Sequence, residues 1–274
     1  MDLFRTEQLN NHLYRIHDIT DVFMYLVIGN ETAALIDTGC GFGDLRSVVE
    51  RLTDKPVVTI LTHGHVDHAF GAAQFDAVYM NRLDIPVYID HCDVKLRLDY
   101  LRMSPLYEPG VEETMLEPAD TEHFLPMGDD TEFDLGGIHI RMYACPGHTP
   151  GSMCALIEED RILITGDACN PLTFLYMPEA LSVSDYKESL VEFGKTVKGR
   201  FDEVLFSHGN IDGEISIVED GIELCDRIIA GQTDGNMEFS FMQWKGLLAA
   251  EADENLIRKD NVRMNIVYNP EKIA

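Results

Sequence analysis

The sequence predicts an α/β protein in which short strands alternate with amphipathic helices. Apolar, β-rich runs separated by turns occupy most of the first 80 residues, two pairs of strand-like segments flank turns near the middle, and two later segments repeat apolar residues at helical spacing. The chain has 274 residues, of which 45% are hydrophobic, so it is long enough and apolar enough to bury a full core.

The N-terminal elements lead towards a histidine-rich segment. Strands are expected at residues 12–16, 22–28 and 33–37, where β-branched and other apolar residues lie between turn formers. Leu45, Val48, Val49 and Leu52 recur at helical spacing, which predicts a helix. The continuous apolar run at 57–61 then predicts a buried strand that exits at His63.

The segment 108–134 has an unusual composition. It contains ten Asp or Glu residues, no Lys or Arg, and the prolines Pro109, Pro118 and Pro126. Such a composition argues against a packed regular element. We expect either an acidic lid beside the active site or an ordinary solvated loop.

Two hairpins are expected after this acidic segment, and each leads to a residue that can bind a metal. Their strands are predicted at 131–135 and 138–143, and at 153–157 and 162–165. The first hairpin is followed by His148, and the second is followed by Asp167.

Two amphipathic helices follow, separated by a strand at 204–206 that runs into His208. The first helix is predicted to bury Val183, Tyr186, Leu190, Phe193 and Val197, and the second Ile215, Val218, Ile222, Cys225 and Ile229. For the second helix, Ser216 and Glu219 have the spacing of a capping box, and Gly231 is placed to end it.

The last 40 residues hold aromatic and aliphatic side chains but no catalytic motif. Phe239, Phe241, Trp244, Leu247 and Leu248 precede a strand-like run at 262–268. We expect this C-terminal extension to serve in packing or in an oligomer contact rather than in catalysis.

The composition of the chain makes some classes of binding partner unfavourable. A formal net charge of −27 repels phosphate backbones and anionic lipids, which makes nucleic acid an unfavourable substrate. No apolar run approaches the roughly 20 residues of a membrane span, and the N-terminus has no basic, apolar leader. The default location expected is therefore the cytoplasm. The six cysteines lack a C-x-x-C pair, so we expect reduced thiols.

The segment Thr62-His63-Gly64-His65-Val66-Asp67-His68 carries the clearest chemical signal. It places three imidazoles and a carboxylate within six positions, on a loop after a predicted strand. These are the ligand types that bind zinc and similar divalent ions, and a loop can direct them to one point. The segment therefore predicts a metal site.

With this segment the chain resembles the metallo-β-lactamase superfamily, whose hallmark is H-x-H-x-D-H followed by a His, an Asp and a final His. The later elements match at His148 in Pro146-Gly147-His148-Thr149, at Asp167 in Thr165-Gly166-Asp167, and at His208 in Ser207-His208-Gly209. The resemblance covers roughly residues 12–231. It implies a four-layer αββα sandwich, which we assign to residues 1–232, and we expect residues 233–274 to form an extension packed on the same domain.

The resemblance also implies a division of ligands between two ions. His63, His65 and His148 would bind one ion, Asp67, His68 and His208 would bind the other, and Asp167 would bridge both. Asp37, in Leu35-Ile36-Asp37-Thr38-Gly39, matches an early Asp that supports the histidine loop by hydrogen bonds, although a turn-forming role is the competing account. Zinc is the favoured ion, with manganese or iron as alternatives.

The other histidines and the cysteines beside the motifs receive simpler interpretations. The histidines outside the family pattern are taken as structural: His12, His17, His91, His123 and His139. Cys40, Cys145 and Cys169 adjoin three of the motifs, which leaves a redox or supporting role open against the commoner role of a small buried residue.

The ligand set implies hydrolysis of an ester-like carbonyl. Two ions that share a water lower its pKa towards about 7, which supplies a hydroxide nucleophile, and Asp67 and Asp167 would take part in catalysis. The ligand set is similar to that of glyoxalase II-type thioesterases and lactonases, so a small-molecule thioester or lactone is the leading substrate class. The alternative functions are a phosphodiesterase or ribonuclease, a mono-iron persulfide dioxygenase-like enzyme, and a non-catalytic metal-binding module. The sequence also leaves open whether the protein forms a homo-oligomer.

The segment 170–178 follows Asp167 directly and is unusually apolar for an exposed loop. Because Asp167 must reach the metals, we expect Leu172, Phe174 and Tyr176 to line the substrate pocket. The alternative is that these side chains pack under the following helix.

Overall fold

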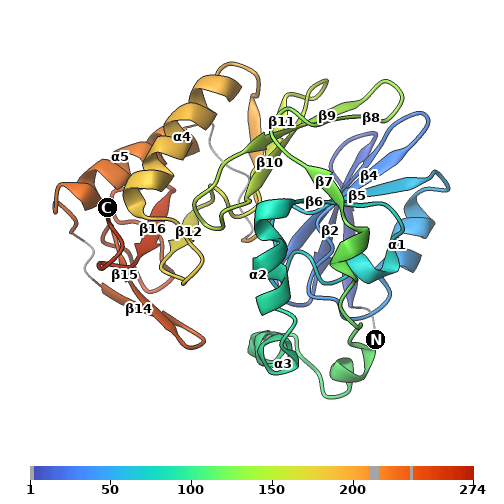
Figure 1. Cartoon of the computed structure of the whole chain (residues 1–274), viewed down its shortest axis with the longest axis horizontal. Coiled ribbons are helices and arrows are strands. Elements are labelled where there is room, and N and C mark those ends of the chain that lie inside the picture. The colour runs from blue at the N-terminus through green and yellow to red at the C-terminus, as the bar shows by residue number, and fades with distance from the viewer. Residues whose placement is uncertain (1–2, 210–215, 235–236) are drawn as a thin grey trace. The chain divides into compact units, whose positions relative to one another are not determined.

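The computed structural model describes residues 3–209, 216–234 and 237–274, and two compact units divide the chain (Figure 1). Unit 1 comprises Met1–Met142 and Ser207–Gly209, and unit 2 comprises Tyr143–Phe206 and Asn210–Ala274. That residues 1–232 act as one domain with 233–274 packed on it stays a prediction.

Unit 1 is built on a seven-stranded sheet in the order β1-β2-β3-β4-β5-β6-β7. Strands β1 to β4 pair antiparallel, and β4 to β7 pair parallel. The strands are β1 (Phe4–Gln8), β2 (Leu13–Asp18), β3 (Phe23–Ile28), β4 (Ala33–Ile36), β5 (Val57–Ile60), β6 (Val78–Asn81) and β7 (Leu125–Met127). The parallel half places the ends of β4 and β5 side by side, and the predicted metal loop leaves from there.

Helix α1 (Leu45–Leu52) covers the sheet of unit 1 as its apolar spacing predicts. Asp44 caps its N-terminus by accepting a hydrogen bond from the backbone N–H of Ser47. Leu45, Val48 and Val49 are buried and join a core cluster with side chains of β2, β3 and β4. The short helix η1 (Ala72–Gln74) follows the metal loop.

Helices that the sequence pattern did not predict lie between β6 and β7. They are η2 (Arg82–Asp84), α2 (Ile85–Asp90), α3 (Val94–Met103), η3 (Val111–Thr114) and η4 (Thr121–His123). The ring of Tyr88 in α2 stacks on Phe70 with centroids 4.6 Å apart, and both belong to a buried cluster with Leu61 and Val66. Helix α2 therefore packs against the loop that carries the histidines.

The prediction that the acidic composition of residues 108–134 excludes a regular element is wrong, because the segment contains η3, η4 and β7, which pairs with β6. Its last strand, β8 (Glu132–Asp134), was expected from the hairpin pattern and pairs with β9 (His139–Ala144). Pro126 is compatible with β7 because β7 is an edge strand, where one missing backbone N–H need not break a ladder. A lid function for this segment stays a prediction.

The described residues of unit 2 form two sheets and two helices. The first sheet has the order β13-β11-β10-β9, with β10 (Met153–Ile157), β11 (Ile162–Ile164) and β13 (Glu203–Leu205); β9 passes from unit 1 into unit 2 after Met142. The second has the order β12-β16-β15-β14, with β12 (Leu172–Leu175), β16 (Asn265–Tyr268), β15 (Trp244–Leu248) and β14 (Met237–Phe241). Helices α4 (Val183–Val197) and α5 (Ile217–Ile229) share one core cluster with both sheets.

Helix α5 is present, but its buried face differs from the prediction. Ile229 is 43% exposed, whereas Ile217, Gly221, Leu224 and Ile228 are buried together with Val218 and Cys225. Glycine carries no apolar signal, yet a Cβ at Gly221 would lie 2.9 Å from Leu190 of α4, so Gly221 allows the helices to pack closely. Ile215 lies outside the described residues.

The predicted C-terminal end of α5 is confirmed, but the predicted N-terminal capping box is not. Ser216 is the N-cap residue but makes no capping hydrogen bond to the backbone; its hydroxyl donates to Asp220 instead, so the predicted capping box is absent. Gly231 follows the helix with φ of 65°, the left-handed conformation that glycine adopts readily at a helix end.

Two further features are the apolar character of the helices and the state of the cysteines. None of the helices within the described residues combines the length and apolar character needed to cross a bilayer. All six cysteines are free, and Cys92 alone among them is not fully buried.

Candidate metal site

Asp37 fixes the start of the histidine loop in unit 1. It follows β4 and takes a left-handed φ of 62°. Its Oδ1 accepts the backbone N–H of Thr62 at 2.7 Å, and its Oδ2 accepts the Thr62 hydroxyl at 2.8 Å. The same Oδ2 lies 2.8 Å from Nδ1 of His68. This contact places a proton on Nδ1 of His68 and leaves its Nε2 lone pair available to a metal.

Three predicted ligands converge in unit 1. The ligand atoms of Asp67, His68 and His208 all lie within 4.8 Å of one another, the arrangement of a group that can hold a metal ion. Nε2 of His208 is 3.3 Å from Oδ2 of Asp67 and 3.3 Å from Nε2 of His68. Side chains from His68 and His208 thus meet although 140 positions separate them in the chain.

His208 reaches this point through the backbone next to β3. The N–H of Phe23 donates to the carbonyl of Ser207 at 2.8 Å, and Val22 and His208 form an isolated β-bridge. Nδ1 of His208 lies 3.2 Å from the carbonyl oxygen of Asp21. His208 and His68 are therefore oriented in the same way, with an oxygen at Nδ1 and with Nε2 turned towards Asp67.

Tyr100 supports the carboxylate of this group. Its hydroxyl, on α3, donates to Oδ2 of Asp67 at 2.6 Å. Burial, together with the nearby Asp67 charge, raises the pKa of Tyr100 well above its usual value, so the phenol keeps its proton and remains a donor. The sequence analysis missed Tyr100 because a single tyrosine in a helix of weak periodicity carries no motif.

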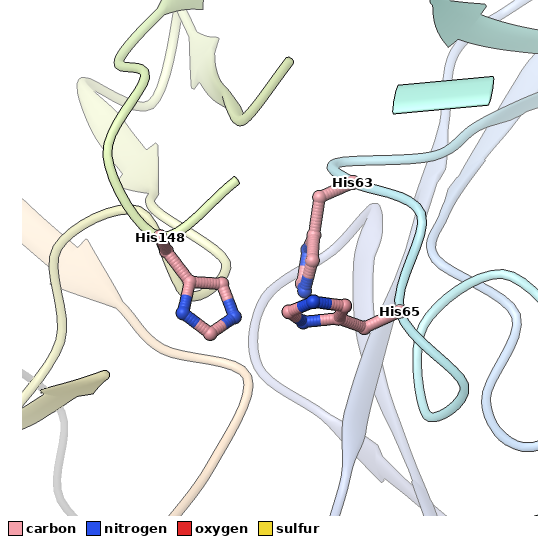
Figure 2. A group of neighbouring side chains, drawn as sticks. All are labelled: His63, His65 and His148. Atoms are coloured by element: carbon pink, nitrogen blue, oxygen red, sulfur yellow. The ribbon is translucent and has the colours of Figure 1, made fainter. Parts of the chain in front are cut away.

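His63 and His65 occupy the first half of the loop in unit 1 (Figure 2). Both are buried, and their ring centroids are 4.8 Å apart. Nδ1 of His63 lies 3.0 Å from the hydroxyl of Thr62. His65 stacks on His91, with ring centroids 4.6 Å apart, and Nδ1 of His91 accepts the backbone N–H of Val66 at 3.1 Å. His91 therefore supports the loop from the end of α2.

Gly64 allows α2 to approach the loop closely. A Cβ on this residue would lie 2.6 Å from the carbonyl oxygen of Asp84 and 2.8 Å from the backbone nitrogen of Tyr88. The N–H of Gly64 also donates to Oδ2 of the buried Asp84 at 2.8 Å. A side chain between the two histidines would push the loop away from this anchor.

In unit 2, His148 and Asp167 lie close together. His148 (Figure 2) follows β9, and its Nδ1 is 2.8 Å from the carbonyl oxygen of Phe174. Its Nε2 is 3.7 Å from Oδ2 of Asp167, which follows β11. The side-chain amide of Asn170 donates to the other oxygen of Asp167 at 3.1 Å. A carbonyl again orients an imidazole, as it does for His208.

Comparison with known proteins decides the family. The profile of the metallo-beta-lactamase superfamily matches residues 18–208, which is most of the chain and includes every predicted ligand. The chain belongs to this superfamily.

Individual relatives agree with this placement in the superfamily. The human acyl-coenzyme A thioesterase MBLAC2 is 26% identical over 207 residues, which is 69% of this chain and 74% of the relative. The probable metallo-hydrolase YybB of Bacillus subtilis is 27% identical over 168 residues, which is 58% of this chain and 70% of the relative.

A solved structure supports the fold. A metallo-beta-lactamase from Pontibacter korlensis matches with a TM-score of 0.56 and 17% identity, covering 80% of this chain and 97% of that chain. The metallo-β-lactamase fold expected from the sequence is thereby confirmed.

The residues present fit the metal ions that the superfamily implies. The group in unit 1 offers two imidazoles and a carboxylate, of which Asp67 and His68 are buried and His208 is half-buried, and hydrogen bonds to oxygen hold both imidazoles at Nδ1. Neutral imidazole and carboxylate are ligands for zinc, and they also accept manganese and iron.

Four of the remaining histidines lie apart from this superfamily ligand set. His12, His17, His123 and His139 belong to no potential metal-binding group in the part of the chain that the structure describes. His17, for example, contacts the carboxylate of Asp21 at 3.0 Å on the surface.

The cysteines beside the superfamily motifs are buried. Burial raises the pKa of the Cys40 and Cys169 thiols well above the usual value, so these groups are neutral. Cys145 and Cys169 belong to the apolar core of unit 2. In these surroundings the three cysteines resemble small apolar residues more than reactive thiols.

The three predicted pocket residues lie in or next to β12. Leu172 and Phe174 are half-buried, and Tyr176 is 3% exposed. All three belong to one apolar cluster on the sheet β12-β16-β15-β14. Their role in a substrate pocket stays a prediction.

Proposed function

We propose that the chain is a dinuclear metal-dependent hydrolase that cleaves a small thioester or lactone. The observation that carries this proposal is the convergence of Asp67, His68 and His208 in unit 1, with both imidazoles oriented through Nδ1. A set of this kind, with room for a further ligand, is typical of catalytic rather than purely structural zinc sites.

The proposed ligands divide between two ions. His63, His65 and His148 would hold the first ion, and Asp67, His68 and His208 would hold the second. Asp167 would contribute to both sites. The motif, the superfamily and the approach of Asp167 to His148 within unit 2 support this division. We favour zinc, with manganese or iron as alternatives.

When bound, the two ions supply a water of lowered pKa and polarise the carbonyl that is attacked. The protein's own groups prepare that chemistry. Asp37 keeps the proton of His68 on Nδ1, which commits Nε2 to metal binding. Tyr100 holds Oδ2 of Asp67 so that the carboxylate does not rotate away from His68 and His208.

A carbonyl substrate with an apolar group fits best. The human relative is named an acyl-coenzyme A thioesterase, and the residues after Asp167 are apolar. The net charge of −27 disfavours a phosphodiesterase or ribonuclease, because polyanions need clustered Lys and Arg. A mono-iron dioxygenase-like enzyme would instead consume oxygen, and a non-catalytic metal-binding module would turn over no substrate.

The proposal also covers the cellular location, the binding partner and the oligomeric state of the protein. We propose a cytoplasmic location, since six free cysteines suit a reducing compartment. The partner is a small molecule rather than a nucleic acid, and a homo-oligomer is compatible with the chain.

A substrate panel combined with metal analysis tests the function. The purified chain, loaded with zinc, manganese or iron in turn, is assayed against thioesters, lactones, β-lactams and phosphodiesters. We expect zinc-dependent cleavage of thioesters or lactones, abolished in His208→Ala and retained in His123→Ala, which alters an exposed histidine. Oxygen consumption with one iron per chain, or cleavage of phosphodiesters alone, would overturn the proposal.

A further inference from the structure

Four half-buried aromatic side chains line one face of the sheet β12-β16-β15-β14 in unit 2. They are Phe174, Phe239, Phe241 and Trp244, here called the aromatic row. Helices α4 and α5 lie against this sheet (Figure 1) and pack with Leu175, Leu247 and Ile266, which alternate to its opposite face. The aromatic row is therefore not the side of the sheet that the helices of unit 2 cover.

The rings of the aromatic row form a continuous surface. The centroid of Phe174 lies 5.2 Å from that of Phe239 and 6.0 Å from that of Phe241. Trp244 pairs directly with Phe241 across the β14–β15 hairpin. The charged residues of this hairpin, Glu238 and Lys245, alternate to the other face of their strands. The surface of the aromatic row thus suits an apolar ligand.

Tyr176 adds a polar atom beside this surface. Its ring lies 5.2 Å from Phe174 and 5.9 Å from Phe239 and packs over Gly246, where a Cβ would approach Tyr176 to 2.7 Å. Its hydroxyl is buried and has no hydrogen-bond partner within the described ranges. A buried hydroxyl without a partner costs free energy, which a bound polar group can recover.

The aromatic row begins at a proposed metal ligand. The backbone carbonyl of Phe174 lies 2.8 Å from Nδ1 of His148, so the residue that orients this imidazole also contributes the first ring. The apolar substituent of a carbonyl group held near His148 would meet Phe174 first and then Phe239 and Phe241.

We propose that the aromatic row binds the apolar acyl chain of the substrate, with the Tyr176 hydroxyl facing a polar atom near the head of that chain. This inference rests on the proposed thioester or lactone hydrolysis and names its substrate class as acyl groups of medium or long chain. It assigns to residues 237–248 a role in specificity, whereas the sequence had predicted packing or an oligomer contact for the C-terminal extension.

The only tryptophan of the chain, Trp244, makes the proposal directly measurable. Its fluorescence is followed while S-butyl, S-octyl and S-dodecyl thioethers of N-acetylcysteamine are added to the metal-loaded protein. These probes cannot be hydrolysed, so binding is read without activity. We expect the Trp244 emission to shift and the affinity to rise about threefold per methylene until the surface is covered.

A matched pair of variants separates the aromatic row from general packing. Phe241→Ala shortens the row, whereas Phe201→Ala removes a phenylalanine that packs against the core of unit 2 elsewhere. We expect Phe241→Ala to lower the ratio of kcat/KM for octanoyl over acetyl thioesters by about tenfold, because several methylenes lose their contact. Phe201→Ala should leave this ratio unchanged.

The outcomes distinguish the inference from the function on which it rests. Hydrolysis of acetyl thioesters with no dependence of Trp244 binding on chain length would overturn the inference and leave the hydrolase proposal intact. Chain-length-dependent binding without hydrolysis of any thioester or lactone would overturn the function while the apolar site stands. A dimer in light scattering that Phe241→Ala dissociates, with no probe binding, would overturn the inference and assign the row to a second copy of the chain.

Discussion

The histidine loop of unit 1 and the aromatic row of unit 2 are held by different kinds of interaction. In the loop, Asp37, Thr62, Asp84 and Tyr100 hold the backbone or the ligands by hydrogen bonds of 2.6 to 2.8 Å. In the row, Phe174 lies 5.2 Å from Phe239 and 6.0 Å from Phe241, and the rings contact one another without directional bonds. The loop is thus held by directional bonds that fix its geometry, whereas the row is an apolar surface that can adapt to what it contacts.

The largest effect is expected for Asp167→Ala compared with Cys169→Ala. Asp167 approaches His148 and is the proposed bridge, whereas Cys169 is a buried thiol whose Sγ contacts the carbonyl of Ile217. We expect kcat/KM to fall about a thousandfold in Asp167→Ala and less than about fivefold in Cys169→Ala, in line with the loss of a metal-binding group against that of a small side chain. Equal losses in steady-state assays would show that Cys169 itself takes part.

Asp37→Asn is expected to have the next largest effect. The amide can still contact Thr62 but carries no charge to hold the proton on Nδ1 of His68. Outer partners of this kind are worth about 10- to 100-fold in metal affinity, so the second ion should bind that much more weakly in competition with a chelator. Unchanged affinity would reduce Asp37 to a turn former.

Tyr100→Phe should have a smaller effect and leave the fold intact. The ring remains, but the 2.6 Å hydrogen bond to Asp67 is lost. We expect roughly tenfold weaker binding of the second ion, which is the lower end of the range for groups that hydrogen-bond to a metal ligand. The visible spectrum of the cobalt-substituted protein should also change, because the Asp67 carboxylate becomes freer to rotate. Tyr107→Phe, which removes the hydroxyl that contacts Glu112, is the control.

The smallest effect concerns packing away from both regions. Gly221→Ala in α5 places a methyl group 2.8 Å from Sδ of Met264 and 2.9 Å from Cδ1 of Leu190, so these side chains must shift. We expect a loss of about 1 kcal/mol in the free energy of unfolding, the lower range for overpacking, with kcat/KM unchanged. Thermal and urea unfolding check the first part. A loss of metal would show that the helices also govern the site.

The sequence predicted most of the frame that leads to the ligands. The strands before Asp37, His63, His148, Asp167 and His208 were each expected, because apolar runs that end in polar residues are local signals. The convergence of His68 with His208 came only from the resemblance to the superfamily, since spacing alone does not join residues 140 positions apart.

Other features were beyond the sequence pattern for physical reasons. Helix α2 has only six residues, helix α3 has weak apolar periodicity, and β7 contains Pro126, so none of the three was expected. The buried face of α5 was misplaced because Gly221 contributes to it through close packing rather than apolarity. Tyr100 gave no signal, since its role depends on how α3 packs against the metal loop.

The most direct test of the central claim is a metal titration of the chelated protein. Zinc is added in steps while bound metal and thioester hydrolysis are measured together, in the wild-type chain and in His208→Ala. The account predicts that activity is complete at two ions per chain, and that His208→Ala binds only one ion tightly and stays inactive. Full activity at one ion per chain, equal in both proteins, would contradict the assignment of Asp67, His68 and His208 as a catalytic metal site.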